Sequence, residues 1–103
     1  MIHTGDTNSV LLTIKTLKSS LEEFIEPDSG LLKSLLSLRV LTRKQAATVG
    51  SKATVYDRND ALLELLTSED QCVKFLEALR RTGQQHVVNF ITQNGGQKHN
   101  DVV

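Results

Sequence analysis

Side chains that could perform nucleophilic chemistry are few in this 103-residue chain. The single cysteine, Cys72, falls on the apolar stripe of a predicted helix, where a free cysteine usually packs as a small buried hydrophobe. Two of the three histidines, His3 and His99, lie in polar segments near the chain ends, and His86 begins a predicted helix with its side chain towards solvent. Cys72 and His86 are the one candidate pair of nucleophile and base, but Cys72 is predicted to face the core and His86 to face solvent, which disfavours the pair. The sequence therefore predicts a protein that is not an enzyme.

Motifs that bind cofactors or metals are also missing from the sequence. Gly95 and Gly96 lie in a polar tail, not between a strand and a helix, where a phosphate-binding loop would be found. A single cysteine excludes an intramolecular disulfide and a multi-cysteine zinc site, and it fits a reducing compartment. We expect no cofactor, no signal peptide, no membrane span and a cytoplasmic location.

Two adjacent cations, Arg80 and Arg81, could contact the phosphates of a nucleic acid. They end a predicted helix, however, where they also compensate the helix dipole. The chain has 12 basic and 12 acidic residues, whereas domains that bind nucleic acid are usually basic. A small helical nucleic-acid-binding domain that uses Arg80 and Arg81 with Lys44 and Lys52 is the alternative from another functional class.

The charges alternate in blocks along the chain although they sum to zero. Residues 27–54 carry five basic residues and one acidic residue, while residues 55–79 carry two basic and six acidic residues. If each block forms one or two helices, the folded domain presents surfaces of opposite charge, which are candidates for protein docking. The candidate basic surface consists of Lys33, Arg39, Arg43, Lys44 and Lys52. The candidate acidic surface consists of Glu22, Glu23, Glu26, Asp28, Asp57, Asp60 and Glu64.

Apolar residues recur every three or four positions between residues 9 and 93, which predicts six helices with short connections and no strand. The first helix runs from Ser9 to just before Pro27 and bends at Ser19-Ser20, where helix propensity is low. Pro27 opens the second helix. Residues 1–8 are predicted to be a flexible N-terminus, and residues 94–103 a disordered tail.

Caps and glycines delimit the other helices. Thr42 and Ser68 each precede a glutamine by three residues, the capping-box spacing, and so begin the third and fifth helices. Asp57 is predicted to cap the fourth helix. Gly50 and Gly83 are predicted to end the third and fifth helices. Every helix has one leucine-rich stripe, which indicates an antiparallel bundle around a single core.

Three segments resemble caspase recruitment domains. GLLKSLLSLRVLTRKQAATV resembles the second and third helices of that family, and NDALLELLTSEDQCVKFLEAL resembles the part that follows. FLEALRRTGQQHVVNFI is similar to the last two helices of initiator-caspase prodomains and related adaptors. The resemblance covers about residues 9–93. It departs from the family at Thr67 to Asp70, where many members have a basic residue and a glycine before the fifth helix.

This resemblance implies a six-helix death-fold bundle with a bent first helix. It implies homotypic docking onto another such domain in a caspase, adaptor or sensor of apoptotic or inflammatory signalling, with self-assembly into oligomers or filaments. An inhibitory decoy is the alternative role. In the family, a basic surface on the first and fourth helices often meets an acidic surface on the second and third. Here the signs are reversed, and charge reversal at Arg43 and Lys44, or at Asp57 and Asp60, is expected to abolish docking.

Overall fold

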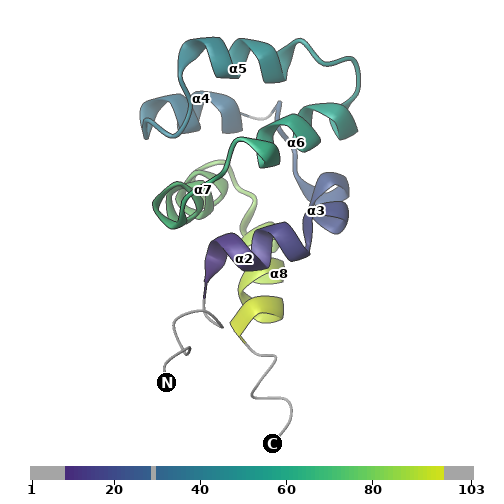
Figure 1. Cartoon of the computed structure of the whole chain (residues 1–103), viewed down its shortest axis with the longest axis vertical. Coiled ribbons are helices and arrows are strands. Elements are labelled where there is room, and N and C mark those ends of the chain that lie inside the picture. Colours follow the sequence, from purple (N-terminus) through teal and green to yellow (C-terminus); the bar gives the residue numbers. More distant parts are fainter. Residues whose placement is uncertain (1–8, 29, 97–103) are drawn as a thin grey trace, which may run out of the picture.

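The computed structural model describes residues 9–28 and 30–96, and within them all regular structure is α-helical. Figure 1 shows the helices with the labels used below. They are α2 Val10–Thr16, α3 Lys18–Phe24, α4 Leu31–Ser37, α5 Arg43–Gly50, α6 Val55–Glu64, α7 Glu69–Arg81 and α8 Gln85–Gly96. The predicted all-α bundle is confirmed. The described part has seven helices and not six, because the predicted first helix is divided into α2 and α3.

The helices stack along the long direction of the molecule (Figure 1). At one end α4 and α5 lie beside each other, α6 and α7 occupy the middle, and α2 and α8 lie at the other end. The helix α7 contacts α2, α4 and α8, and α3 packs on α6. The core follows this arrangement, because α7 buries apolar residues towards several neighbours at once.

The leucine-rich stripes form one core, as the sequence predicts. On α7, the adjacent side chains of Phe75 and Leu76 are both buried. Because α7 has neighbours on several sides, its apolar face is wider than a single stripe. The largest fully buried side chains are Phe75, Ile14, Leu21, Ile25, Leu31, Leu35, Leu62, Leu66, Leu79, Ile91, Val49 and Val87.

The bend in the predicted first helix lies at Leu17, two residues before the predicted Ser19-Ser20. Leu17 has φ −94° and ψ 9°, which is not helical. Its N–H still donates to the carbonyl of Thr13 at 2.9 Å, and its carbonyl accepts from Leu21 at 2.9 Å. The chain therefore changes direction without losing these hydrogen bonds, and α3 can lay its apolar residues against α6.

Two predicted helix starts are wrong. Pro27 is a buried turn residue, and α4 begins only at Leu31, after Gly30 with φ 95°. Asp57 does not cap α6, because the hydroxyl of Thr54 accepts from the N–H of Asp57 at 3.0 Å and the helix begins at Val55. Thr54 has the extended backbone of an N-cap, which leaves Asp57 in the first turn, where its charge favours the helix dipole.

The other predicted caps are confirmed. Thr42 and Ser68 both form complete capping boxes. The cap hydroxyl accepts a hydrogen bond from the backbone N–H of the glutamine three residues later, and the side chain of that glutamine accepts one from the backbone N–H of the cap residue. Gly50 is the last residue of α5, and Gly83 follows the end of α7 with φ 78°. The last helix continues to Gly96, three residues beyond the predicted end of the domain. The remainder of the predicted tail and the N-terminal segment 1–8 lie outside the described residues.

Two helices end in the same Schellman motif, but with different residues at its left-handed position. At the end of α7, Gly83 takes this position, and Gln84 N–H donates to the carbonyl of Leu79 at 2.8 Å. At the end of α4, Arg39 takes it with φ 62°, and Val40 N–H donates to Leu35 at 2.9 Å. Left-handed backbone is strained for a residue with a Cβ. Arg39 therefore holds strain that a glycine would not.

Replacing Arg39 with glycine is expected to raise the free energy of unfolding by about 0.5–1 kcal/mol, because relief of left-handed strain exceeds the added entropy of the unfolded chain. Urea denaturation followed by circular dichroism measures the change. Gly83→Ala is the matched opposite, and it is expected to cost about 1 kcal/mol. A Cβ at Gly83 meets no atom within 4 Å, so that loss would report backbone strain alone. A less stable Arg39→Gly variant would contradict this account.

Candidate docking surfaces

The five predicted basic residues are all exposed, and they lie on α4, on α5 and in the loops on either side of α5. Lys33 lies on α4, Arg39 in the turn between α4 and α5, Arg43 and Lys44 in the first turn of α5, and Lys52 in the loop before α6. None of the five takes part in an ion pair with another described residue. Their charges are therefore available to a partner.

Two hollows divide these basic residues. A groove of about 690 Å³ at the turn between α4 and α5 is lined by Leu36, Ser37, Arg39, Leu41, Thr42 and Arg43. A smaller hollow of about 390 Å³ between α5 and α6 has Lys44 and Lys52 among its lining residues. Lys33 lines neither hollow. The structure thus brings the two arginines together at one groove, which is called the arginine groove below, and the two lysines at another.

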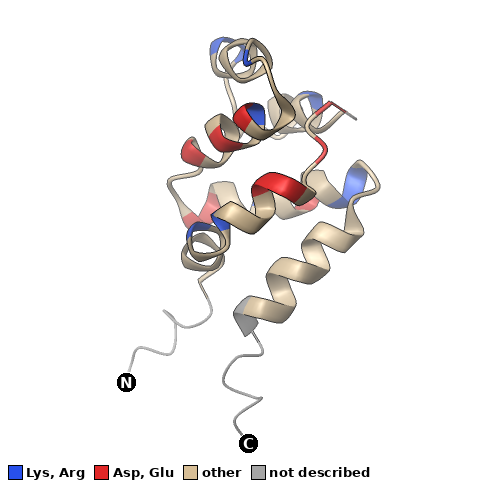
Figure 2. Ribbon diagram, turned by 90° about the vertical axis from the view of Figure 1, so that its right-hand side faces the viewer, with Lys and Arg blue, Asp and Glu red and all other residues tan. Residues whose placement is uncertain are grey.

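The predicted acidic residues gather on α3 and α6, which pack against each other (Figure 2). Glu22 and Glu23 lie on α3, and three more lie on α6. Glu26 and Asp28 follow α3 in the connection to α4. Acidic residues from two separate sequence blocks therefore lie on helices that pack against each other. The members on α6 are Asp57, Asp60 and Glu64.

Lys18, which the sequence did not single out, neutralises much of this acidic surface from within the domain. Its Nζ lies 2.5 Å from an oxygen of Asp60, 2.9 Å from Glu64 and 3.5 Å from Glu22. The hydrogen bond to Asp60 is the main cause that raises the pKa of Lys18, and the same bond lowers the pKa of Asp60. Desolvation is the main cause that raises the pKa of Glu22, which is nearly buried.

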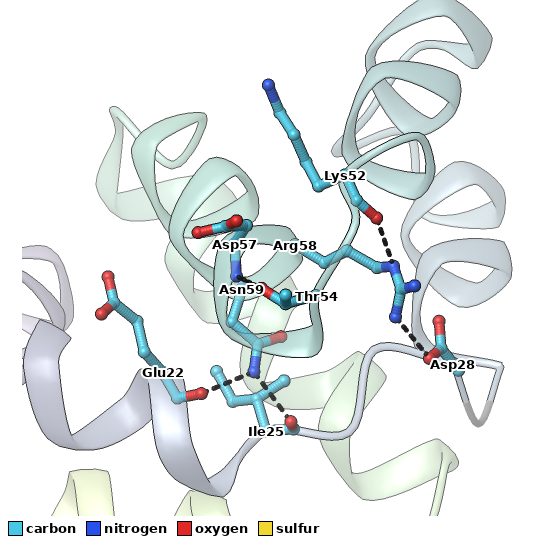
Figure 3. Close-up of polar contacts among 8 residues, drawn as sticks. All are labelled: Glu22, Ile25, Asp28, Lys52, Thr54, Asp57, Arg58 and Asn59. Atoms are coloured by element: carbon cyan, nitrogen blue, oxygen red, sulfur yellow. Dashed lines mark hydrogen bonds and ion pairs between the residues drawn. The ribbon is translucent and has the colours of Figure 1, made fainter.

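A second ion pair occupies Asp28 (Figure 3). Arg58 on α6 holds it with Nη1 at 2.9 Å, while Arg58 Nε donates to the carbonyl of Lys52 at 3.1 Å. Four of the seven predicted acidic residues are therefore paired inside the domain. Among the described residues, Glu23 and Asp57 form no ion pair. The acidic charge offered to a partner is centred on these two residues.

A buried amide sets the spacing of α3 and α6. Asn59 is fully buried, and its Nδ2 donates to the carbonyls of Glu22 and Ile25, both at 2.9 Å (Figure 3). These carbonyls lie at the end of α3, where helical partners run out. The other amide atom, Oδ1, has no hydrogen-bond partner among the described atoms. The available signal in the sequence was a polar residue one turn before Leu62 and Leu63 on the apolar stripe.

The end of α3 is also held from the opposite part of the bundle. Gln84, in the turn between α7 and α8, is nearly buried. Its Nε2 donates to the carbonyl of Glu26 at 3.0 Å, and its Oε1 accepts from the N–H of Glu26 at 2.8 Å. Asn59 and Gln84 therefore satisfy the backbone where α3 leaves the helical conformation, and they fix the carboxylates that α3 carries.

The start of α2 is capped by a side chain from α7. Glu69 accepts hydrogen bonds from the N–H groups of Val10 and Leu11 at 2.8 and 3.0 Å, and from the hydroxyl of Ser9 at 2.9 Å. Desolvation of Glu69 opposes ionisation, but the bonds from Leu11, Val10 and Ser9 outweigh it and lower the pKa of Glu69. The carboxylate joins the N-termini of two helices that are 60 residues apart in sequence.

Glu69→Gln is expected to cost about 1 kcal/mol of stability at pH 7, because a neutral amide is a weaker acceptor for three donors. The folded pKa of Glu69 is depressed, so its contribution is present above the unfolded pKa and is lost as pH falls through the folded pKa. Urea denaturation at pH 7 and below pH 4 should therefore show the parent and the variant converging in acid. A constant difference at both pH values would contradict the role of the charge.

The residues considered for catalysis do not form a site in the described structure. Cys72 is fully buried, and desolvation raises the pKa of its thiol to about 11, which disfavours the thiolate at neutral pH. His86 is exposed, and His3 and His99 lie outside the described residues. No group of three histidine, cysteine, aspartate or glutamate residues in the described part could hold a metal ion.

The arginines considered for phosphate contact are engaged by an acidic residue on their own helix. Arg80 lies 3.6 Å from Glu77, and Arg81 lies 3.2 Å from it. These exposed ion pairs contribute little to stability, but they reduce the net charge of this patch. None of the described helices has the length and apolar character needed to cross a membrane.

Comparison with known proteins identifies one family. The model of the caspase recruitment domain family matches residues 12–94, which is most of the chain. No curated protein and no solved structure matches the chain significantly. The family match spans all seven helices, apart from the first residues of α2 and the last residues of α8.

Proposed function

Because the chain belongs to the caspase recruitment domain family, a family of protein-interaction modules, we propose that it docks onto another recruitment domain in the cytoplasm. The partner belongs to a caspase, an adaptor or a sensor of apoptotic or inflammatory signalling. Docking brings catalytic domains together, so activity rises through effective concentration and not through chemistry in this chain.

The observation that carries this proposal is the separation of charge between two pairs of helices. The α4–α5 side carries basic residues without intramolecular ion pairs among the described residues, and the α3–α6 side carries the acidic surface (Figure 2). Complementary charged surfaces give orientation and a fast association rate more than affinity, and salt weakens them. The polarity is the reverse of the arrangement common in the family.

Binding to a panel of recruitment domains, this chain included, at low and high salt tests the proposal. Two double variants report on the surfaces: Arg43→Glu with Lys44→Glu, and Glu23→Lys with Asp57→Lys. Each is expected to weaken binding by at least about 100-fold at low salt. Asp60 is left unchanged because its reversal would also break the Lys18 ion pairs.

Lys15→Glu with Lys74→Glu is the control, since it changes net charge by as much as the basic-surface variant, at an exposed site on α2 and a half-buried site on α7 where Lys74 pairs with Asp70 of its own helix. It is expected to bind like the parent. Parent-like binding by both surface variants would sink the assignment of these surfaces. Tight binding of the parent to a nucleic-acid duplex at physiological salt, lost on changing Arg80 and Arg81, would favour the nucleic-acid alternative.

A further inference from the structure

The arginine groove has the form of a site for a partner side chain. Leu36 and Leu41 supply apolar surface, and Arg39 and Arg43 supply two guanidinium groups. Its volume of about 690 Å³ falls within the range of ligand-binding clefts. Within residues 9–28 and 30–96, neither arginine has an acidic partner. An occupant must therefore combine an apolar group with negative charge.

The backbone at Arg39 gives a separate reason to look for a role at this groove. Arg39 holds the left-handed position of a helix end that Gly83 holds without strain in the same motif on α7. Backbone strain that a glycine would relieve is often found at functional sites. The side chain of Arg39, the residue in this strained conformation, lines the groove.

The matching feature lies on the acidic surface of the same chain. Tyr56 at the start of α6 is 48% exposed, and its neighbour Val55 is 42% exposed. Desolvation is the main cause that raises the pKa of Tyr56, and the nearby carboxylates of Glu22 and Glu23 raise it further. Glu23 and Asp57, which have no ion pair with any described residue, flank it on α3 and on α6. Exposed tyrosine is among the residues that most often dominate binding energy.

The two features cannot meet within one molecule. In Figure 1 the turn between α4 and α5 lies at the left edge of the bundle, and the start of α6 lies at the right edge. A contact between them joins two copies head to tail. Such a contact leaves a free groove at one end and a free tyrosine at the other, so it extends into an open assembly unless it closes into a ring.

We propose that Tyr56 of one copy inserts into the arginine groove of a second copy, with Glu23 and Asp57 facing Arg39 and Arg43. The ring packs on Leu36 and Leu41 and against a guanidinium plane, an arrangement that favours arginine over lysine. The carboxylates accept charge-assisted hydrogen bonds from the same two arginines. This proposal rests on the docking function above and names the partner as a second copy of this chain.

Two complementary variants of the full chain test the contact. The groove variant, Arg39→Glu with Arg43→Glu, keeps Tyr56, and the tyrosine variant, Tyr56→Ala with Asp57→Asn, keeps the groove. Each alone is expected to remain monomeric in sedimentation velocity at concentrations where the parent assembles. Mixed together, they are expected to form a 1:1 dimer, because Tyr56 of the groove variant can enter the intact groove of the tyrosine variant. The dimer cannot grow, because its remaining groove and its remaining position 56 both carry the substitutions.

Tyrosine fluorescence reports the contact directly, because Tyr56 is the only tyrosine and the chain has no tryptophan. In the mixture, the signal comes from the groove variant alone. Its quenching by neutral succinimide is expected to fall several-fold when the tyrosine variant is added in excess. Tyr56→Phe is expected to assemble within about threefold of the parent, and Tyr56→Ala at least about tenfold more weakly. Val73→Ala removes another exposed apolar side chain and should leave assembly unchanged.

The outcomes separate this inference from the proposed function. Loss of binding to other recruitment domains in the surface variants, with no 1:1 dimer in the mixture, would overturn the self-contact and leave the docking function standing. A dimer in which Tyr56 stays as accessible as in the monomer would overturn the role of the tyrosine. A parent chain that binds recruitment domains but stays monomeric at every concentration would also overturn the proposal.

Discussion

Replacing Asn59 with aspartate is expected to lower the free energy of unfolding by about 3 kcal/mol or more at pH 7, the cost of an uncompensated buried charge. The change keeps the shape of the side chain but removes the NH₂ group that donates to the carbonyls of Glu22 and Ile25. The new carboxylate would face two carbonyl oxygens in a fully buried position. Urea denaturation at pH 7 measures the loss, which is large against the 5–15 kcal/mol typical of a domain.

The pH dependence of this variant distinguishes charge from shape. Burial raises the pKa of the new carboxyl group in the folded state, so its penalty is largest above that pKa and shrinks as the pH falls below it. At pH 5 the loss relative to the parent is therefore expected to be smaller than at pH 7. The protonated acid can still donate one hydrogen bond, so part of the tie between α3 and α6 returns.

Asn89→Asp is the matched control for this substitution. Asn89 is exposed on α8, and its Oδ1 accepts a hydrogen bond from Gln85 at 3.1 Å, which a carboxylate also accepts. The same chemical change is expected to alter stability there by no more than about 0.5 kcal/mol. Equal effects of the two substitutions at pH 7 would mean that the buried amide does not hold the acidic surface in place.

Phe75→Ala is expected to cost about 3–5 kcal/mol, because it removes the largest fully buried side chain and leaves a cavity in the core. For a domain of this size, the midpoint temperature of thermal unfolding should fall by about 15 °C or more. Circular dichroism at about 222 nm, which reports helix content, follows this unfolding transition. Docking should fail together with folding, which makes this variant the reference for surface changes that weaken docking without unfolding.

Val73→Ala is the control on the same helix. Val73 lies two residues before Phe75 on α7, but half of its side chain is exposed. Its truncation is expected to change stability by no more than about 0.5 kcal/mol. A loss from Phe75→Ala as small as that from Val73→Ala would show that α7 is not central to the core.

The sequence by itself determined the fold class and most helix ends, because these depend on local patterns. Apolar spacing predicted the stripes that are buried, and the capping boxes at Thr42 and Ser68 form as their spacing requires. The family resemblance is confirmed by the family match over residues 12–94. The acidic residues of two sequence blocks lie on α3 and α6, which pack against each other, while their role as a docking surface stays a prediction.

Other features were decided by contacts between helices that are distant in sequence. The bend at Leu17 follows the packing of α3 on α6, although the serines two residues later have the lower helix propensity. Thr54 rather than Asp57 caps α6, because Thr54 has the extended backbone of an N-cap and Asp57 lies within the first turn of the helix. Local propensity differences are a few tenths of a kcal/mol, so tertiary packing outweighs them.

The candidate surfaces also depend partly on the sequence and partly on contacts that only the folded chain makes. Residue charges were readable from the sequence, but their partners were not. Lys18 neutralises Asp60 and Glu64 across 42 and 46 positions, and Arg58 neutralises Asp28 across 30. Only the tertiary structure brought Glu23 near the exposed Tyr56, whereas Asp57 follows Tyr56 in the sequence. Ion pairing depends on distances of a few ångströms between side chains, which the folded backbone sets and the spacing along the chain does not.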